Sequence, residues 1–198
     1  MKTLKRVLFY TSLTIVVLLV ALVGSVFLFK DRIINQFIRE ANKQLSTPVK
    51  IGKIDVSVFQ QFPQLSIVFT DVYVEDSHPG QYPLLTAKRI SFIMNPVEVW
   101  QGTYTIKGLK ILDSETNLKI DAKGENNYTI VKKSEGTGKG SVSFELSNVE
   151  LTGTKVNYLD RKLKQDFIFT SKDLLASIDT ENDVYDIQAS GELTTEKM

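Results

Sequence analysis

Residues 64–76 read QLSIVFTDVYVED, and this stretch decides how the β-rich part of the chain is built. Its first half alternates apolar residues with others, as one buried side of a strand should. After Asp71 the alternation slips by one position. A β-bulge inserts one residue and shifts the phase by one, and Asp tolerates the left-handed backbone that such irregularities use. The sequence therefore predicts a bulge at Asp71 that puts four apolar side chains on one face: Ile67, Phe69, Val72 and Val74.

The same slip recurs in two later stretches, YTIKGLKILD around Gly108 and SFELSNVELTG around Asn148. The three centres lie 37 and 40 residues apart, a spacing typical of stacked supersecondary units. Gly and Asn also suit a bulge, and repeated bulges would curl a sheet. The two later stretches add these residues to the predicted apolar face: Ile106, Leu109, Ile111, Leu146, Val149 and Leu151.

The chain from residue 48 to 198 is predicted to be one mainly β domain. Its segments are short, rich in β-branched and aromatic residues, and separated by Gly, Asn, Asp and Pro. Strands are predicted at residues 49–59, 64–75, 85–94, 104–112, 116–122, 128–132, 141–151, 155–160, 164–170, 174–180 and 185–193. Residues 95–102, NPVEVWQG, are expected to hold a short helical turn with Trp100 as a core residue, and residues 132–141 a polar loop.

Residues 7–29 form an uncharged run of 23 residues, long enough to cross a bilayer as a helix. Lys2, Lys5 and Arg6 precede it, so residues 1–6 are expected to stay cytoplasmic and the rest to be exported. The alternative is a cleaved signal peptide, whose apolar core is only ~7–15 residues long and ends in a small-x-small site. The longer run, followed by FLFKDR, favours an uncleaved signal anchor.

Residues 30–47 are predicted to form an amphipathic helix that joins the anchor to the β domain. Pro48 disfavours helix at the residue before it. The helix could close one end of the domain with one apolar stripe. That stripe contains Ile34, Phe37, Ile38 and Ala41.

Composition and motifs argue against several classes of function. A net charge of +1 gives no nucleic-acid signal, and the absence of cysteine excludes thiolate metal sites and cysteine nucleophiles. His78 is the only histidine, and its DSHPGQYP context predicts a surface turn rather than a catalytic or metal site. The stretch GTGKGS lacks the spacing of a phosphate-binding loop. We therefore expect no enzyme activity, no cofactor and no metal.

The predicted apolar face has two possible uses. It could close on a second sheet as the core of a β-sandwich, or stay open to an apolar ligand. A soluble monomer rarely exposes an apolar patch beyond a few hundred Å², so an open face implies a partner. The predicted anchor makes lipid a natural partner, and each acyl CH₂ buried gains about 0.8 kcal/mol.

Four features in order resemble the N-terminal region of the AsmA family of bacterial envelope proteins, relatives of TamB. They are the anchor helix, the stretch VKIGKIDVSVFQQFPQLSIVFTDVYVED, the stretch AKRISFIMNPVEVWQGTYTIKGLKILDSETNLKI, and the turn DAKGENNYTI. The resemblance covers roughly residues 1–131. It implies a single-pass protein of the bacterial inner membrane whose bulk, in the periplasm, is a curled, largely antiparallel β-groove.

The resemblance also implies that the groove shields phospholipid chains and supports outer-membrane assembly. Family members are usually several hundred residues longer. The chain therefore looks like the membrane-proximal start of a bridge: a fragment, a short member, or one that needs an envelope protein partner or further β repeats. The competing hypothesis is an anchored β-sandwich that acts as a scaffold or assembly factor for outer-membrane proteins and has no lipid ligand.

Overall fold

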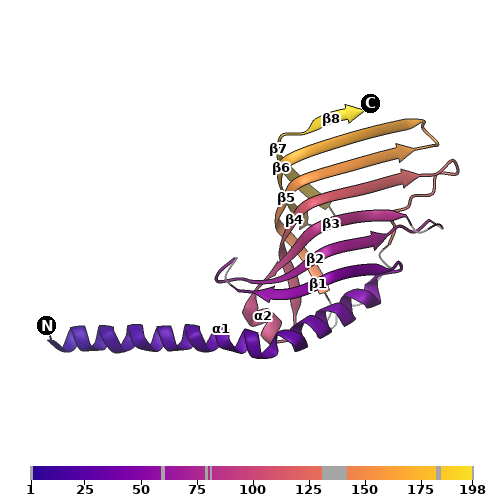
Figure 1. Ribbon diagram of the computed structural model, residues 1–198. Helices are drawn as coiled ribbons and strands as arrows, with labels where there is room; N and C mark the ends of the chain where they lie inside the picture. The colour runs from indigo at the N-terminus through magenta and orange to yellow at the C-terminus, as the bar shows by residue number, and fades with distance from the viewer. Residues whose placement is uncertain are drawn as a thin grey trace.

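The computed structural model describes residues 2–58, 61–78, 80, 82–130, 142–181 and 184–197. It consists of a long N-terminal helix, one bent sheet and a short second helix (Figure 1). The elements in chain order are α1 (Lys2–Gln44), β1 (Val49–Ser57), β2 (Leu65–Glu75), β3 (Pro83–Met94), α2 (Pro96–Trp100), β4 (Tyr104–Ile120), β5 (Val142–Asp160), β6 (Gln165–Glu181), β7 (Val184–Gly191) and β8 (Thr194–Lys197).

The described strands form a single sheet in the order β1 to β7, and β8 pairs with the first half of β6. Neighbouring strands are antiparallel except for β4 and β5, which run parallel. The sheet does not close on itself. The prediction of a mainly β, largely antiparallel sheet is confirmed. A β-sandwich needs two sheets that face each other, and the described strands belong to one sheet.

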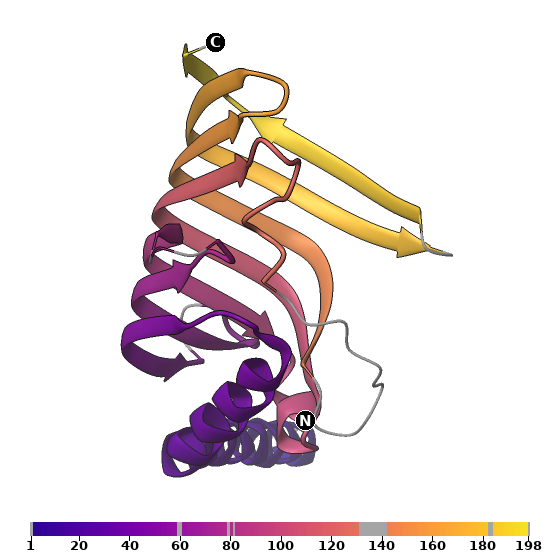
Figure 2. The ribbon, with the colours of Figure 1, turned by 90° about the vertical axis from the view of Figure 1, so that its right-hand side faces the viewer.

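Six neighbouring strands bend at the same level, which gives the sheet the cross-section of a trough (Figure 2). Between β1 and β6 the strand pairing omits one residue of each strand there, and all six omitted residues are exposed. Three of them have positive φ angles: Asp71 at 55°, Asp113 at 49° and Gly153 at 63°. This level is called the bend row and contains Gly52, Asp71, Lys88, Asp113, Gly153 and Lys172.

The bend row explains the phase slip at Asp71 and corrects its predicted cause. The register of β2 with β1 and with β3 is unchanged on the two sides of Asp71, so no residue is inserted there. Strands β1 and β3 bend at the same level, and on each of them the alternation of inward-facing residues also shifts by one position at the bend. On β3, for example, Ala87 pairs with Val72 and Ile90 pairs with Phe69. The slip is therefore a bend shared by the sheet, not a bulge in one strand.

The predicted irregularity at Gly108 is confirmed as a true bulge. Ile93 and Met94 are adjacent on β3 but pair with Gly108 and Ile106, which leaves Lys107 as the extra residue. The slip at Asn148 also coincides with a shift of register. The pairs of β4 with β5 jump from Ile106–Phe144 to Gly108–Asn148, so β5 carries two more residues than β4 over this interval.

Three pairs of predicted strands are each one long strand. The predicted gaps at residues 113–115, 152–154 and 171–173 fall on the bend row of β4, β5 and β6. Asp113 and Gly153 predict strand ends, but β4 and β5 continue through them. The strand predicted at 128–132 is wrong for residues 128–130, which form a loop, and residues 131–141, including the polar loop predicted at 132–141, lie outside the described residues. The short strand β8 was not predicted.

Helix α1 is continuous from Lys2 to Gln44 and so contains both predicted N-terminal helices. Its first part projects away from the sheet, and its last part runs beneath β1 (Figure 1). It ends before the predicted residue 47, because the Ser46 N–H donates to the Ile130 carbonyl, 2.8 Å away, outside the helix. Within the described residues, no helix has the length and apolar character needed to cross a membrane.

Residues 121–130, here called the clasp, tie the end of α1 to the sheet. Asn127 is fully buried, and its Nδ2 donates to Asp76 Oδ2 (3.0 Å) and to the Asn117 carbonyl (2.9 Å). Its Oδ1 accepts from the Lys119 N–H at 2.8 Å. A buried amide with every bond made contributes to specificity, because leaving any partner unpaired is costly. Because the Ile130 carbonyl of the clasp accepts from Ser46 just after α1, the clasp links the end of this helix to β4 and to Asp76 after β2.

Candidate functional site

Two apolar rows run across the inner face of the trough, one residue from each of β1 to β6. Residues directly paired between strands share a face, so the pairing defines these rows. One row is Ile54, Phe69, Ile90, Ile111, Leu151 and Leu174. The next is Val56, Ile67, Phe92, Leu109, Val149 and Ala176. Each row presents a continuous apolar strip that runs across the strands, along the trough.

A third apolar row lies on the opposite arm of the trough, beyond the bend. It contains Val49, Val74, Leu85, Thr116, Val156 and Phe169. Small residues occupy the inner corner between the arms: Ser114, Thr154 and Ser171 are all buried, and the hydroxyls of the first two are 3.1 Å apart. Small side chains fit this corner, where the bend brings the two arms together.

The inner face is filled by the protein itself at the β1 end. Phe37 of α1 is 2% exposed, and its ring centroid lies 5.9 Å from that of Phe69, 5.5 Å from Phe92 and 6.2 Å from Tyr104. Aromatic pairs at such distances pack favourably. The last part of α1 therefore packs on the inner face at this end of the trough.

The residues predicted to form the apolar face differ in accessibility. Five of them belong to the buried core under α1: Ile67, Phe69, Val72, Val74 and Ile106. Leu109, Ile111 and Leu146 are partly buried against it, Val149 is buried, and Leu151 is half-buried. On α1, Phe37 is core, Ile34 packs against it and Ile38 is half-buried, while the Ala41 side chain lies outside the described set.

The inner face becomes more accessible toward β6. Leu151, Leu174, Val156 and Phe169 are half-buried, and none belongs to the core cluster. Leu174, Val156 and Phe169 are not in the predicted apolar face, because that face includes only residues close to the three predicted bulges. The bends at Gly153 and Lys172 were the signal that would have placed them. The part of the trough that could receive a ligand is thus its β5–β6 half.

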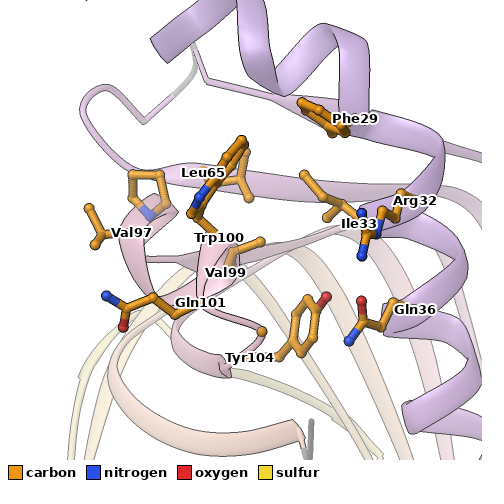
Figure 3. A pocket seen from close by; sticks show the side chains of 12 residues that line it. Phe29, Arg32, Ile33, Gln36, Leu65, Val97, Val99, Trp100, Gln101 and Tyr104 are labelled. Carbon is orange, nitrogen blue, oxygen red and sulfur yellow. The ribbon is translucent and has the colours of Figure 1, made fainter.

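A pocket of about 760 Å³ opens between α1, α2 and the end of the sheet (Figure 3). Its walls are mainly apolar, with Phe29 and Ile33 from α1, Leu65 from β2, and Val99 and Trp100 from α2. Its polar side chains come from two sides and are Arg32 and Gln36 on α1 and Gln101 after α2. The pocket therefore combines a mainly apolar lining with one cationic side chain, Arg32.

Helix α2 is held rigidly at the edge of this pocket. The Asn95 Oδ1 accepts from the Val97 N–H at 2.8 Å and caps the helix, and Pro96 follows at its first position. Glu98 pairs with Lys107 of β4 at 2.7 Å. Trp100, predicted as a core residue, is instead 65% exposed, and its ring meets that of Phe29 at 5.4 Å in an edge-to-face contact.

Two carboxylates near the clasp take part in hydrogen bonds that hold loops. Among the described residues no group of His, Asp and Glu has the geometry of a metal site. Asp76, beside His78, is 3% exposed and is bonded to Asn127 and to the His78 N–H. In the clasp, N–H donors of Glu125, Lys123 and Gly124 hold the pKa of Asp121 below its ordinary value. These carboxylates hold loops in place.

Comparison with known proteins gives no assignment, because no family model, curated protein or solved structure matches the chain.

Proposed function

We propose that the chain is a membrane-anchored protein that binds the acyl chains of phospholipid in its trough. The observation that carries the proposal is the pair of apolar rows that cross six strands on one face. Among the described residues, the core cluster that contains Phe37 of α1 includes or packs against row residues of β1 to β4, whereas the row residues of β5 and β6 lie outside it. An apolar strip of this kind, still partly accessible at Leu151 and Leu174, favours a partner that removes it from water.

Acyl chains fit the strip because it is apolar throughout and offers few polar groups. From β1 to β6 the apolar rows span about 24 Å, taking five strand spacings of about 4.8 Å. Each CH₂ transferred from water gains about 0.8 kcal/mol, so a long chain needs no directional contact. The polar headgroup would remain in water above the open side of the trough.

The N-terminal part of the chain supports the membrane location. The uncharged run at residues 7–29, preceded by three cations, is proposed to be a signal anchor of the bacterial inner membrane with the β domain in the periplasm. The trough also agrees with the architecture that the AsmA resemblance implies. We accordingly place the protein in phospholipid transport that supports outer-membrane assembly, with an envelope protein or further β repeats as partner.

Two adjacent leucines on β6 provide the test. Leu174 pairs with Leu151 on the inner face, whereas Leu175 pairs with Glu150 on the outer face and is 52% exposed. A photoreactive benzoylphenylalanine is placed at either position in the full chain, the cells are irradiated, and the purified protein is assayed for crosslinked, radiolabelled phospholipid. Lipid adducts are expected at residue 174 and not at residue 175.

Equal labelling at the two positions, or none at residue 174 in a folded protein, would reject the groove. Protein adducts at residue 174 in place of lipid would instead favour the scaffold hypothesis. The matched residue type and adjacent positions ensure that expression and depth along the trough are the same in both variants.

A further inference from the structure

Helix α2 presents large apolar side chains to solvent although it is only five residues long. Trp100 is 65% and Val97 56% exposed, and Phe29 of α1, in ring contact with Trp100, is 40% exposed. The helix cannot rotate to hide them, because Val99 is buried in the core and Glu98 is paired with Lys107. The exposed surface formed by Phe29, Val97 and Trp100 is here called the α2 surface.

The α2 surface lies where the uncharged part of α1 ends. Phe29 is the last residue of the run at 7–29, and Lys30 and Arg32 follow it. In Figure 1, α2 sits beside α1 at the point where the helix reaches the sheet. If α1 crosses a bilayer, this point is the level at which it leaves the hydrocarbon, and Trp is enriched at that level because its ring is apolar with one polar N–H.

We propose that the α2 surface is a second membrane contact, with Val97 and Trp100 seated in the interface of the same bilayer that holds α1. The inference rests on the proposed anchor. A bilayer is favoured over a protein partner because the surface is continuous with the uncharged run through the Phe29–Trp100 contact. Arg32 also lies where lipid phosphates would, and long cationic side chains suit that layer.

This contact would set the orientation of the β domain. One helix alone leaves a domain free to tilt and turn at the surface, whereas a helix and a rigid second contact fix it. The pocket between α1 and α2, which Phe29, Val97, Trp100 and Arg32 help to line, would then lie at the bilayer surface. An acyl chain leaving the bilayer could reach the pocket without first crossing water.

Trp100 is itself the probe, since it is the only tryptophan in the chain. The full chain is reconstituted in nanodiscs whose phospholipids carry bromine either near the headgroup end or near the terminus of the acyl chains. Trp100 fluorescence is expected to be blue-shifted and to be quenched more strongly by bromine near the headgroup end. A Val97→Asp variant keeps the reporter and should lose part of this quenching, because a carboxylate opposes insertion.

A relocated tryptophan supplies the control. Leu163, in the β5–β6 turn, is 64% exposed, and Trp100→Phe combined with Leu163→Trp should give fluorescence that neither brominated lipid quenches. Equal, weak quenching of Trp100 and of the relocated tryptophan would overturn the inference. Blue-shifted but unquenched Trp100 would also overturn it, because the residue would then be covered by protein.

Failure of this inference can be told apart from failure of the proposed function. A chain that alkaline carbonate removes from membranes lacks the anchor. A chain that stays in the membrane and crosslinks lipid at residue 174, but leaves Trp100 unquenched, keeps the proposed function and loses only the second contact.

Discussion

Asp71 and Asp113 hold positive φ angles that most side chains avoid, and Gly153 completes the set on β5. Asp is one of the few residues besides Gly that adopt this region at modest cost. Gly153 adopts its positive φ without strain. A Cβ at this position would lie 2.7 Å from Asp113 Oδ1, so the Asp113 side chain would have to move.

The bend row therefore predicts a specific sensitivity at Asp71. Asp71→Val should lower the free energy of unfolding by about 1–2 kcal/mol, because a β-branched side chain is strained at positive φ. Asp71→Asn should leave it nearly unchanged. Both are measured on the full chain in detergent by denaturant unfolding followed by circular dichroism. Since Asp71 is exposed, equal stability of the two variants would mean that this backbone conformation is not maintained.

Asp121 predicts a dependence on pH. N–H donors of the clasp favour its charged form, and its pKa is lowered in the folded state. The associated stability is present above the unfolded pKa of about 3.9 and is lost as pH falls through the lower folded pKa. Asp121→Asn should therefore weaken the loss of stability in acid below about pH 4. Unfolding curves at a series of pH values compare it with the wild-type chain, and parallel curves would contradict the prediction.

At the scale of elements, the closing of the trough by α1 depends on one side chain more than on the rest. Phe37 contacts three rings on the sheet and is 2% exposed. Phe37→Ala should lower the free energy of unfolding by about 3–5 kcal/mol, the usual range for truncating a buried Phe. Phe144→Ala on β5 is the control, since Phe144 is 59% exposed, and should cost far less. Comparable losses in the two variants would show that α1 does not pack on the inner face.

The strands show what could be predicted from the sequence and what could not. Alternation placed β1, β2 and β3 within a few residues of their bounds, because they have one buried face. It divided β4, β5 and β6 in two, since Asp113 and Gly153 are typical of turns. The positive φ of Asp113 and Gly153 suits either a turn that ends a strand or a bend within a continuous strand. Hydrogen bonds to the neighbouring strands decide between them, and those bonds depend on residues far away in the sequence.

The candidate site was predictable to a similar extent. The phase slips identified an apolar face, and the pairing places those residues on the inner side of the sheet. Which part of that face is accessible depends on where Phe37 packs, a tertiary contact that no local pattern encodes. The exposure of Trp100 has the same origin. Val99, rather than its larger neighbour, points into the core, because Glu98 and Asn95 fix the rotation of α2.

For the whole molecule, the proposed anchor predicts which side of the membrane each end faces. The chain has no cysteine, so Thr3→Cys and Glu192→Cys each introduce a single thiol. In intact spheroplasts a membrane-impermeant maleimide should label residue 192 and should reach residue 3 only after lysis. Labelling of residue 3 in intact cells would reverse the proposed orientation. A mobility-shift gel resolves the two outcomes, and the parent chain without cysteine is the control.

Because of the bend row, the width and the length of the trough are set by different features of the sheet. The width of the trough is set by where each strand bends, a matter of one residue per strand. Its length is set by how many strands are stacked, and β7 and β8 form its last edge. Duplicating a hairpin that carries its own bend residue would lengthen the trough without changing its cross-section. Gene duplication of this kind would lengthen the proposed lipid groove while keeping its cross-section.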